Sequence, residues 1–468
     1  MSYTVPYLIS FLIGYFLISL TFSLTHGNQR SRTLPNSPPL YLHFFLAAGL
    51  GLSMSANIVF YILVFVDRIN KNFSIQFNLL LLFLLVLAQF YFCRKNKNPF
   101  WKLAGWDLQK SAAIFLIVLL LIPLWKYAQL FQPFGGWDAW QVWNFKAKFL
   151  TLGEDHWKNM FSPLLWRSSP HYPLLLPLIN VWAWLFLDQP LDIVPLITAS
   201  LFTFLTGGLL FSSLSSLTKN YHAIFATLLI FTLPFWALLA TSQYSDIVLA
   251  YYLLASMICW LEGSRQNSPA YLFLSGLFLG SLSFTKSEGT IAVTVIFLLA
   301  IFYTFFNKAK TYDHKLKLFF SFLVGSAING LPTLLFEWLY APMNQTFING
   351  LISTSHPASL ERFKVIMVFF LVEIINKKWN GLWILLMAGI FLSKGKGFNK
   401  TLIIFPLFLG TYLMIVLVYY FLNTYFEIFW WLQNTLARIL FGILPVVIFW
   451  VFVSLEWEDK KSRSNEGE

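Results

Sequence analysis

The sequence predicts an all-α membrane protein, a polytopic bundle of about thirteen transmembrane helices. Of its 468 residues, 58% are hydrophobic and 11% are charged, and the mean hydropathy is +0.67. Soluble domains carry about 25% charged residues, so this chain has too few charged side chains to cover a large water-exposed surface. Aromatic residues make up 19% of the chain, which is typical of membrane helices with aromatic belts at the interfaces.

Apolar runs that can cross a bilayer recur along the whole chain, since a crossing takes about 20 apolar residues. The first run has neither a basic n-region nor a small-residue cleavage site, so we expect it to be retained as a span. The candidate spans are 5–24, 40–66, 75–93, 111–130, 193–217, 221–240, 246–262, 269–285, 288–306, 315–336, 379–393, 401–422 and 436–455.

Two further apolar segments are expected to lie along the membrane surface. Segment 172–187 is rich in Pro and Trp, and segment 363–375 is short and is followed by Lys377 and Lys378. With both segments on the surface, four basic stretches fall on one side of the membrane, which the positive-inside rule makes the cytoplasmic side. These stretches are Arg94–Lys110, Lys308–Lys317, Lys394–Lys400 and the tail Lys460–Arg463.

This arrangement places the N-terminus outside and the C-terminus inside the cell. The net charge of +12 then reflects membrane topology, and binding to nucleic acid is not expected. Two long loops, 131–192 and 337–378, lie outside. Within 137–150, one helical arc holds Asp138, Asn144 and Lys148 and the opposite arc is apolar, which predicts an amphipathic helix in the interface plane.

Ionisable side chains gather at the outer ends of the predicted helices, where they are costly and often functional. Asp138 follows Gly135-Gly136, whose flexible backbone permits a tight turn. It is either a helix N-cap or a general base at the membrane surface. His171 precedes the segment that starts with Tyr172-Pro173. It is either an interface anchor or a group that binds a phosphate or a sugar.

Four more charged residues have a structural and a functional interpretation. Asp246 is either a helix cap or part of the site, and Lys286 and Glu288 in a short turn form either a structural ion pair or one phosphate-sized site. Arg438 either snorkels to the interface or binds a lipid phosphate through two hydrogen bonds. A carboxylate base, several cations and an aromatic cleft at the membrane surface suit a lipid-phosphate leaving group.

Four ordered stretches between 131 and 445 resemble the polytopic glycosyltransferases of the GT-C fold. The resemblance is to the family 39-like group, which includes protein O-mannosyltransferases and lipid A aminoarabinose transferases. The stretches are Gly136–Trp140 with Trp143 and Lys146–Lys148, His171–Leu178, Tyr244–Asp246 with 272–282 and Thr285–Gly289, and Trp431–Arg438 with Pro445.

The resemblance implies that Asp138 is the catalytic base of an inverting transfer from a polyprenyl-phosphate sugar. His171, Asp246, Lys286, Glu288 and Arg438 match positions around the donor phosphate or sugar. The reaction would take place on the outer face of a multi-pass protein in a bacterial cytoplasmic membrane. The expected division of the chain is 1–110 as accessory spans, 111–336 as the catalytic core and 337–468 as C-terminal spans with a cytoplasmic tail.

The chain also departs from the pattern of that family. Three spans within 1–93 precede the shared core, and a single acid, Asp138, stands where some relatives carry two. We therefore expect no metal requirement and no cofactor. Without a sizeable outer domain, a glycan or lipid acceptor is favoured over a protein. The alternatives are a transporter or lipid flippase, which would need broken helices and charges near the midplane, and a non-catalytic scaffold.

Overall fold

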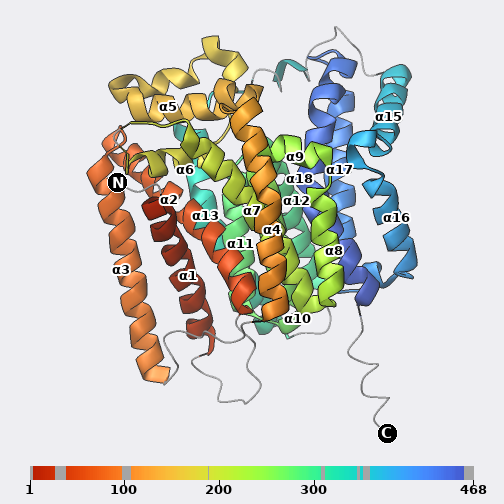
Figure 1. Cartoon of the computed structure of the whole chain (residues 1–468), viewed down its shortest axis with the longest axis horizontal. Coiled ribbons are helices and arrows are strands. Elements are labelled where there is room, and N and C mark those ends of the chain that lie inside the picture. Colours follow the sequence, from red (N-terminus) through yellow and green to blue (C-terminus); the bar gives the residue numbers. More distant parts are fainter. Residues whose placement is uncertain are drawn as a thin grey trace.

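The computed structural model describes residues 4–26, 38–96, 107–187, 189–306, 311–344, 348–350 and 359–457. These residues are overwhelmingly helical and contain no strand, so the predicted all-α class is confirmed. Figure 1 shows most helices side by side along one direction, with short helices of the segment 131–192 crossing one end. We call that end of the bundle the loop face and the other end the opposite face.

Ten of the described helices are long and apolar enough to cross a membrane, which supports the prediction of a multi-pass membrane protein. Their positions agree with ten of the predicted spans. They are α1 (Thr4–His26), α2 (Leu40–Val66), α3 (Lys71–Asn96), α4 (Leu108–Phe131), α7 (Ile193–Leu217), α10 (Ser245–Gln266), α12 (Ser287–Phe306), α13 (Tyr312–Leu339), α17 (Ile404–Leu422) and α18 (Ile428–Glu456).

The other three predicted spans are shorter or broken. Segment 221–240 is a pair of helices, α8 (Asn220–Phe231) and α9 (Pro234–Thr241), bent by 70° where a proline opens the second helix. Segment 269–285 is α11 (Pro269–Ser283), which at about 22 Å is shorter than a ~30 Å hydrocarbon core. Segment 379–393 contains α16 (Leu382–Leu392).

The loop between α4 and α7 forms a cover over the loop face, at the top of Figure 1. It contains η1 (Ala139–Trp143), α5 (Asn144–Leu152), η2 (Glu154–Phe161) and η3 (Pro163–Ser168). The segment expected on the membrane surface, 172–187, forms α6 (Leu175–Trp184), and every residue of this helix is buried. It packs beneath α5 and against α2, so its apolar side chains contact protein on all sides.

The second segment expected on the surface has a different arrangement. Figure 1 shows α15 (Leu360–Ile374) descending from the loop face and continuing into α16, so together they make one interrupted crossing beside α18. The interruption contains η4 (Lys377–Trp379), followed by Asn380 and Gly381 with positive φ angles of 47° and 70°. A left-handed pair of this kind ends one helix before another begins. Because one crossing, 379–393, was predicted here, the predicted number of crossings does not change.

The described parts of three basic stretches, 94–96 with 107–110, 311–317 and 394–400, flank the opposite face, where η5 (Lys396–Phe398) follows α16. Lys394, Lys396 and Lys400 are exposed there. The rest of the prediction falls partly on segments 97–106, 307–310 and 458–468, which lie outside the described residues. That this face is cytoplasmic remains a prediction.

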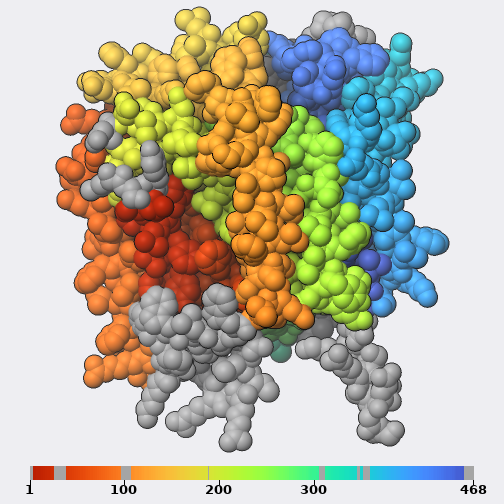
Figure 2. Space-filling model, in the orientation of Figure 1, coloured from red at the N-terminus to blue at the C-terminus, as the bar shows by residue number. Residues whose placement is uncertain are grey.

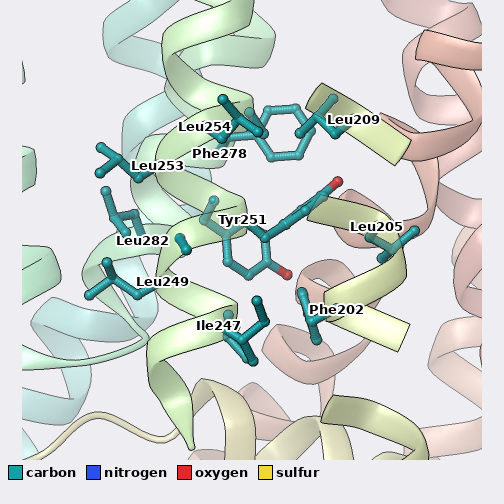
Figure 3. Close-up of a cluster of buried hydrophobic side chains, with 14 of the residues drawn as sticks. Phe202, Leu205, Leu209, Ile247, Leu249, Tyr251, Leu253, Leu254, Phe278 and Leu282 are labelled. Carbon is teal, nitrogen blue, oxygen red and sulfur yellow. The ribbon is translucent and has the colours of Figure 1, made fainter. Parts of the chain in front are cut away.

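Helix α10 is the most enclosed of the long helices, and it carries one of the candidate site residues at its start. Figure 3 shows its side chains interdigitating with those of α7 and α11 around Tyr251. The hydroxyls of Tyr251 and Tyr252 donate to the carbonyls of Phe45 and Gly49 at 2.6 and 2.8 Å, which ties α10 to α2. Buried polar groups must find partners inside the protein where lipid offers none. The loop-face end of α10 is therefore firmly positioned.

Candidate functional site

Five of the six predicted site residues form one continuous chain of ion pairs near the loop face. Arg438 contacts Asp138 at 2.7 Å and Asp246 at 2.7 Å. Lys286 contacts Asp246 at 3.4 Å and Glu288 at 2.9 Å. The chain joins three carboxylates to two cations, and its members come from segments up to 300 residues apart. We call these five residues the loop-face cluster.

Arg438 lies deeper in the bundle than the sequence suggested. The last span was predicted to start at 436, but α18 starts at Ile428, where the Glu427 side chain caps the helix through the amides of Phe429 and Trp430. Arg438 is ten residues further on, or about 15 Å along the axis. Its side chain is 18% exposed and turns inward to two carboxylates, so snorkelling to the surface is not its role.

Asp246 is the central acid of the cluster. It stands in the first turn of α10 with a side chain that is 5% exposed, and no cap hydrogen bond is recorded at that helix end. Instead it accepts from Nε and Nη2 of Arg438 at 3.3 and 2.7 Å and from Nζ of Lys286 at 3.4 Å. A guanidinium matches a carboxylate through two parallel bonds, and a buried carboxylate needs such partners. Asp246 is therefore not a helix cap. Its carboxylate binds two cations, Arg438 and Lys286.

Lys286 occupies the turn between α11 and α12, where its side chain is 6% exposed. Burial opposes the charged ammonium, but the carboxylates of Asp246 and Glu288 outweigh burial and raise the pKa of Lys286. Glu288 binds Lys286 through Oε1, while its Oε2 is buried without a hydrogen-bond partner among the described residues. That oxygen is free to accept a hydroxyl from a ligand.

Asp138 is the most accessible acid of the cluster, with a side chain that is 25% exposed. Two glycines bring it to the start of α10. Gly135 has a φ of 75°, and the amide of Gly136 donates to the carbonyl of Ser242 at 3.0 Å. A Cβ on Gly136 would lie 2.4 Å from the hydroxyl of Tyr244, so a larger residue here would displace the Tyr244 side chain. The Asp138 side chain makes no cap hydrogen bond at η1, and its recorded partner is Arg438.

His171 does not join the loop-face cluster. Its ring packs edge-on against Tyr172 with centroids 4.8 Å apart. Burial and the nearby charge of Lys146 lower the pKa of His171 to about 4. The imidazole is therefore neutral at neutral pH and suits hydrogen bonding better than pairing with an anion.

Three residues outside the predicted set shape the site. Nζ of Lys146 and Nζ of Lys286 are each 5.9 Å from the centroid of the Tyr172 ring. Lys146 is completely buried and donates to the carbonyls of Ser169 and Tyr172 at 2.8 Å each, and burial lowers its pKa well below the ordinary value. On a helical wheel Lys146 falls beside Ala139, on the apolar side of 137–150, which is a signal that the sequence analysis did not use.

The third residue is Tyr244, whose ring lies 4.8 Å from the guanidinium carbon of Arg438. Cation–π contacts of this kind stabilise a guanidinium that has lost its water. Burial raises the pKa of Tyr244, so its hydroxyl stays protonated and can donate. Tyr244 precedes Asp246 in the sequence stretch that carries the family resemblance, but it was not predicted as a site residue.

An open pocket of about 430 Å³ lies beside Asp138 on the loop face. Its wall includes the exposed Trp140 ring and the ion pair of Lys148 with Asp192 at 3.0 Å. Amides of Asn144 and Gln243 are joined at 2.9 Å at its edge. The loop-face cluster does not line this pocket, but backbone segments 135–138 and 243–246 connect the two. The lining residues are Phe131, Gln132, Pro133, Phe134, Gly135, Trp140, Asn144, Lys148, Asp192 and Gln243.

In the loop-face cluster, the accessible carboxylate of Asp138 contacts Arg438. The more buried carboxylate of Asp246 binds both Arg438 and Lys286. Such an arrangement can accept a proton at Asp138 and stabilise negative charge near Arg438 and Lys286. Within the described residues, no group of three or more His, Cys, Asp or Glu side chains is arranged to hold a metal ion. The acids of the cluster are separated by cations instead.

Comparisons with known proteins give no family assignment. No family model, no curated protein and no solved structure matches this chain. The function is therefore inferred from the chemistry of the loop-face cluster and from the membrane setting of the helices.

Proposed function

We propose that this chain is an integral membrane glycosyltransferase. It moves a sugar from a polyprenyl-phosphate donor to an envelope glycan, lipid or protein acceptor on the extracytoplasmic face, with inversion at the anomeric carbon. The observation that carries the proposal is the contact of Asp138 with Arg438, which in turn binds Asp246. A candidate base and a candidate phosphate-binding cation thus lie side by side near the loop face of the bundle.

The proposed reaction uses four of the five charged residues of the cluster. The acceptor hydroxyl gives its proton to the Asp138 carboxylate as its oxygen forms a bond to the anomeric carbon. The bond from that carbon to the phosphate oxygen breaks, and its electron pair leaves with the polyprenyl phosphate. Arg438 and Lys286 counter the charge that develops on the phosphate. Asp246 keeps both cations in place before the donor arrives.

The resting ion pair between Asp138 and Arg438 has a functional consequence. A donor phosphate that binds Arg438 competes with the Asp138 carboxylate for Nη1, which lies 2.7 Å from Oδ2. Donor binding would then release the carboxylate to contact the acceptor hydroxyl. In this scheme the base becomes available only when the donor is in place, which limits unproductive hydrolysis.

The pocket beside Asp138 suits the acceptor in this scheme. Trp140 offers a ring face, and Asn144 and Gln243 offer amide groups within one wall. Sugars bind well where an aromatic face and a few polar groups converge. An acceptor in this pocket would approach from the aqueous loop face, whereas the lipid tail of the donor would stay in the bilayer.

The second candidate is a transporter or lipid flippase, and one observation favours it. The interruption of α15 and α16 lies beside the bend between α8 and α9, and it carries Lys377 and Lys378. Broken helices with charges near the midplane are typical of secondary transporters. The loop-face cluster, however, lies toward one end of the bundle.

Proteoliposomes with a radiolabelled polyprenyl-phosphate sugar and a glycan acceptor test the proposal. Asp138→Asn should lower the transfer rate by about 10²- to 10⁴-fold, the usual contribution of a general base. Asp155→Asn is the matched control, because Asp155 is an exposed acid of the same loop outside the cluster. Full activity of Asp138→Asn contradicts the assignment of the base. Movement of intact donor between leaflets without sugar transfer favours the flippase instead.

A further inference from the structure

The two broken crossings of the bundle contact each other at their breaks. Nδ2 of Asn380, in the interruption between α15 and α16, donates to the carbonyl of Thr232 at the α8–α9 bend, at 3.1 Å. The Trp379 ring meets the Phe235 ring edge-on at 5.2 Å, and Nζ of Lys378 lies 4.9 Å from the Phe235 centroid. Figure 2 shows the surface of this part of the molecule, where the region of α16 borders that of α8. The breaks therefore form one joint structural feature.

This feature lies at membrane depth. Phe235 and Trp236 of α9 contact Phe441 of α18, with ring centroids 6.3 and 4.5 Å apart. Phe441 is near the middle of α18, which runs from Ile428 to Glu456. It lies three residues, or about 4.5 Å along the axis, beyond Arg438. The breaks thus reach the level of Phe441, about one helical turn deeper in the bundle than Arg438 of the loop-face cluster.

The charged residues at the interruption between α15 and α16 carry a net positive charge. Glu373 is buried and accepts from Nε1 of Trp379 and from Nζ of Lys378, both at 2.8 Å. Lys377 is exposed and forms no ion pair within the described part of the chain. The neighbouring surface is apolar, because Leu371 and Ile375 are 60% and 65% exposed. One uncompensated cation therefore faces lipid, which is costly unless an anion from the bilayer reaches it.

We propose that the interruption 375–381 binds the phosphate group of a bilayer lipid. Lys377 and Lys378 donate to the phosphate oxygens, and Glu373 is a positioning residue that orients Lys378. The exposed apolar side chains around the lysines make the bilayer the source of the ligand, since acyl chains can pack against them. The proposal is independent of glycosyl transfer, because a flippase or a scaffold could hold a lipid in the same place.

Native mass spectrometry of the purified full-length protein tests this site. The probes are dioleoylphosphatidylglycerol and dioleoylglycerol, which lacks the phosphate, with inorganic phosphate as a competitor. A direct hydrogen bond that involves a charged group strengthens binding by at least about tenfold. Lys377→Gln with Lys378→Gln should therefore weaken phosphatidylglycerol binding by at least about tenfold and leave dioleoylglycerol unaffected.

Two further variants sharpen the result. Lys394→Gln with Lys396→Gln makes the same change in charge beyond the far end of α16 and should leave this binding unchanged. Glu373→Gln still accepts from Trp379 but frees Lys378, so it should tighten binding severalfold. Equal binding by the wild type and the Lys377/Lys378 variant overturns the proposal. So does an equal loss in the control variant, or displacement of the lipid by inorganic phosphate as effectively as by phosphatidylglycerol.

Discussion

The ion pair between Asp246 and Arg438 provides the sharpest prediction about the loop-face cluster. Asp246→Asn leaves Arg438 and Lys286 with one fewer buried anion, and Arg438→Gln leaves Asp246 and Asp138 close together without the cation between them. Removal of one partner of a buried pair typically costs about 3–5 kcal/mol, because the other charge stays buried and uncompensated. We expect each single substitution to lower the free energy of unfolding by this amount.

The hydrogen bonds of Arg438 determine the expected size of this loss of stability. Arg438 donates through Nη2 and Nε to Asp246 and through Nη1 to Asp138, at 2.7, 3.3 and 2.7 Å. A hydrogen bond to a charged group contributes about 1.5–3 kcal/mol, so the two short bonds alone account for about 3–6 kcal/mol. The double variant Asp246→Asn/Arg438→Gln loses both charges together. Its destabilisation should be smaller than the sum of the singles by about 2–3 kcal/mol.

Thermal unfolding in detergent, followed by size-exclusion chromatography of the remaining native protein, measures these effects. The matched control is the ion pair of Lys148 and Asp192, because each of these side chains is 47% exposed. Exposed pairs contribute about 0–1 kcal/mol, so Lys148→Gln and Asp192→Asn should change stability little. Single cluster variants no less stable than this control would refute the reasoning. Strict additivity in the double variant would refute it as well.

Three other predictions concern the segments that support the cluster. Gly136→Ala should lower the transfer rate severalfold, because its Cβ would lie 2.4 Å from the Tyr244 hydroxyl and displace the ring that packs on Arg438; unchanged activity contradicts this. Lys146→Met should reduce stability by about 1–3 kcal/mol in a thermal melt, because the carbonyls of Ser169 and Tyr172 lose their donor. The pKa of His171 is lowered to about 4, so the unfolded chain takes up this proton first and stability should fall from pH 6.5 to pH 4. His171→Gln should remove part of that fall, and an identical pH profile contradicts the assignment.

Most spans could be predicted because their apolar length is a local property of the sequence. Segments 40–66 and 193–217 match α2 and α7 residue for residue. The start of α18 was predicted eight residues too late, because Gln433 and Asn434 interrupt its apolar pattern. The helix starts earlier because Glu427 caps it. The joining of α15 to α16 depends on contacts with α9 and α18, which hydropathy does not encode.

The membership of the loop-face cluster was largely predictable, but its connectivity was not. Charged residues at the ends of apolar runs are conspicuous, which identified Asp138, Asp246 and Arg438. That one guanidinium binds both acids depends on three segments of the chain meeting in space, and Asp138 and Arg438 are 300 residues apart. The position of Lys146 on the apolar side of 137–150 indicated that it is buried, but its partners are backbone carbonyls, which the sequence does not identify.

A cryo-electron microscopy structure with a polyprenyl monophosphate bound would test the central claim most directly. The account predicts the phosphate within hydrogen-bonding distance of Arg438 and Lys286, with the Asp138 carboxylate displaced from its 2.7 Å contact with Nη1. It also predicts that Asp246 keeps its contacts with both cations. A phosphate bound at the opposite face, or a loop-face cluster left unchanged with the lipid bound elsewhere, would contradict it.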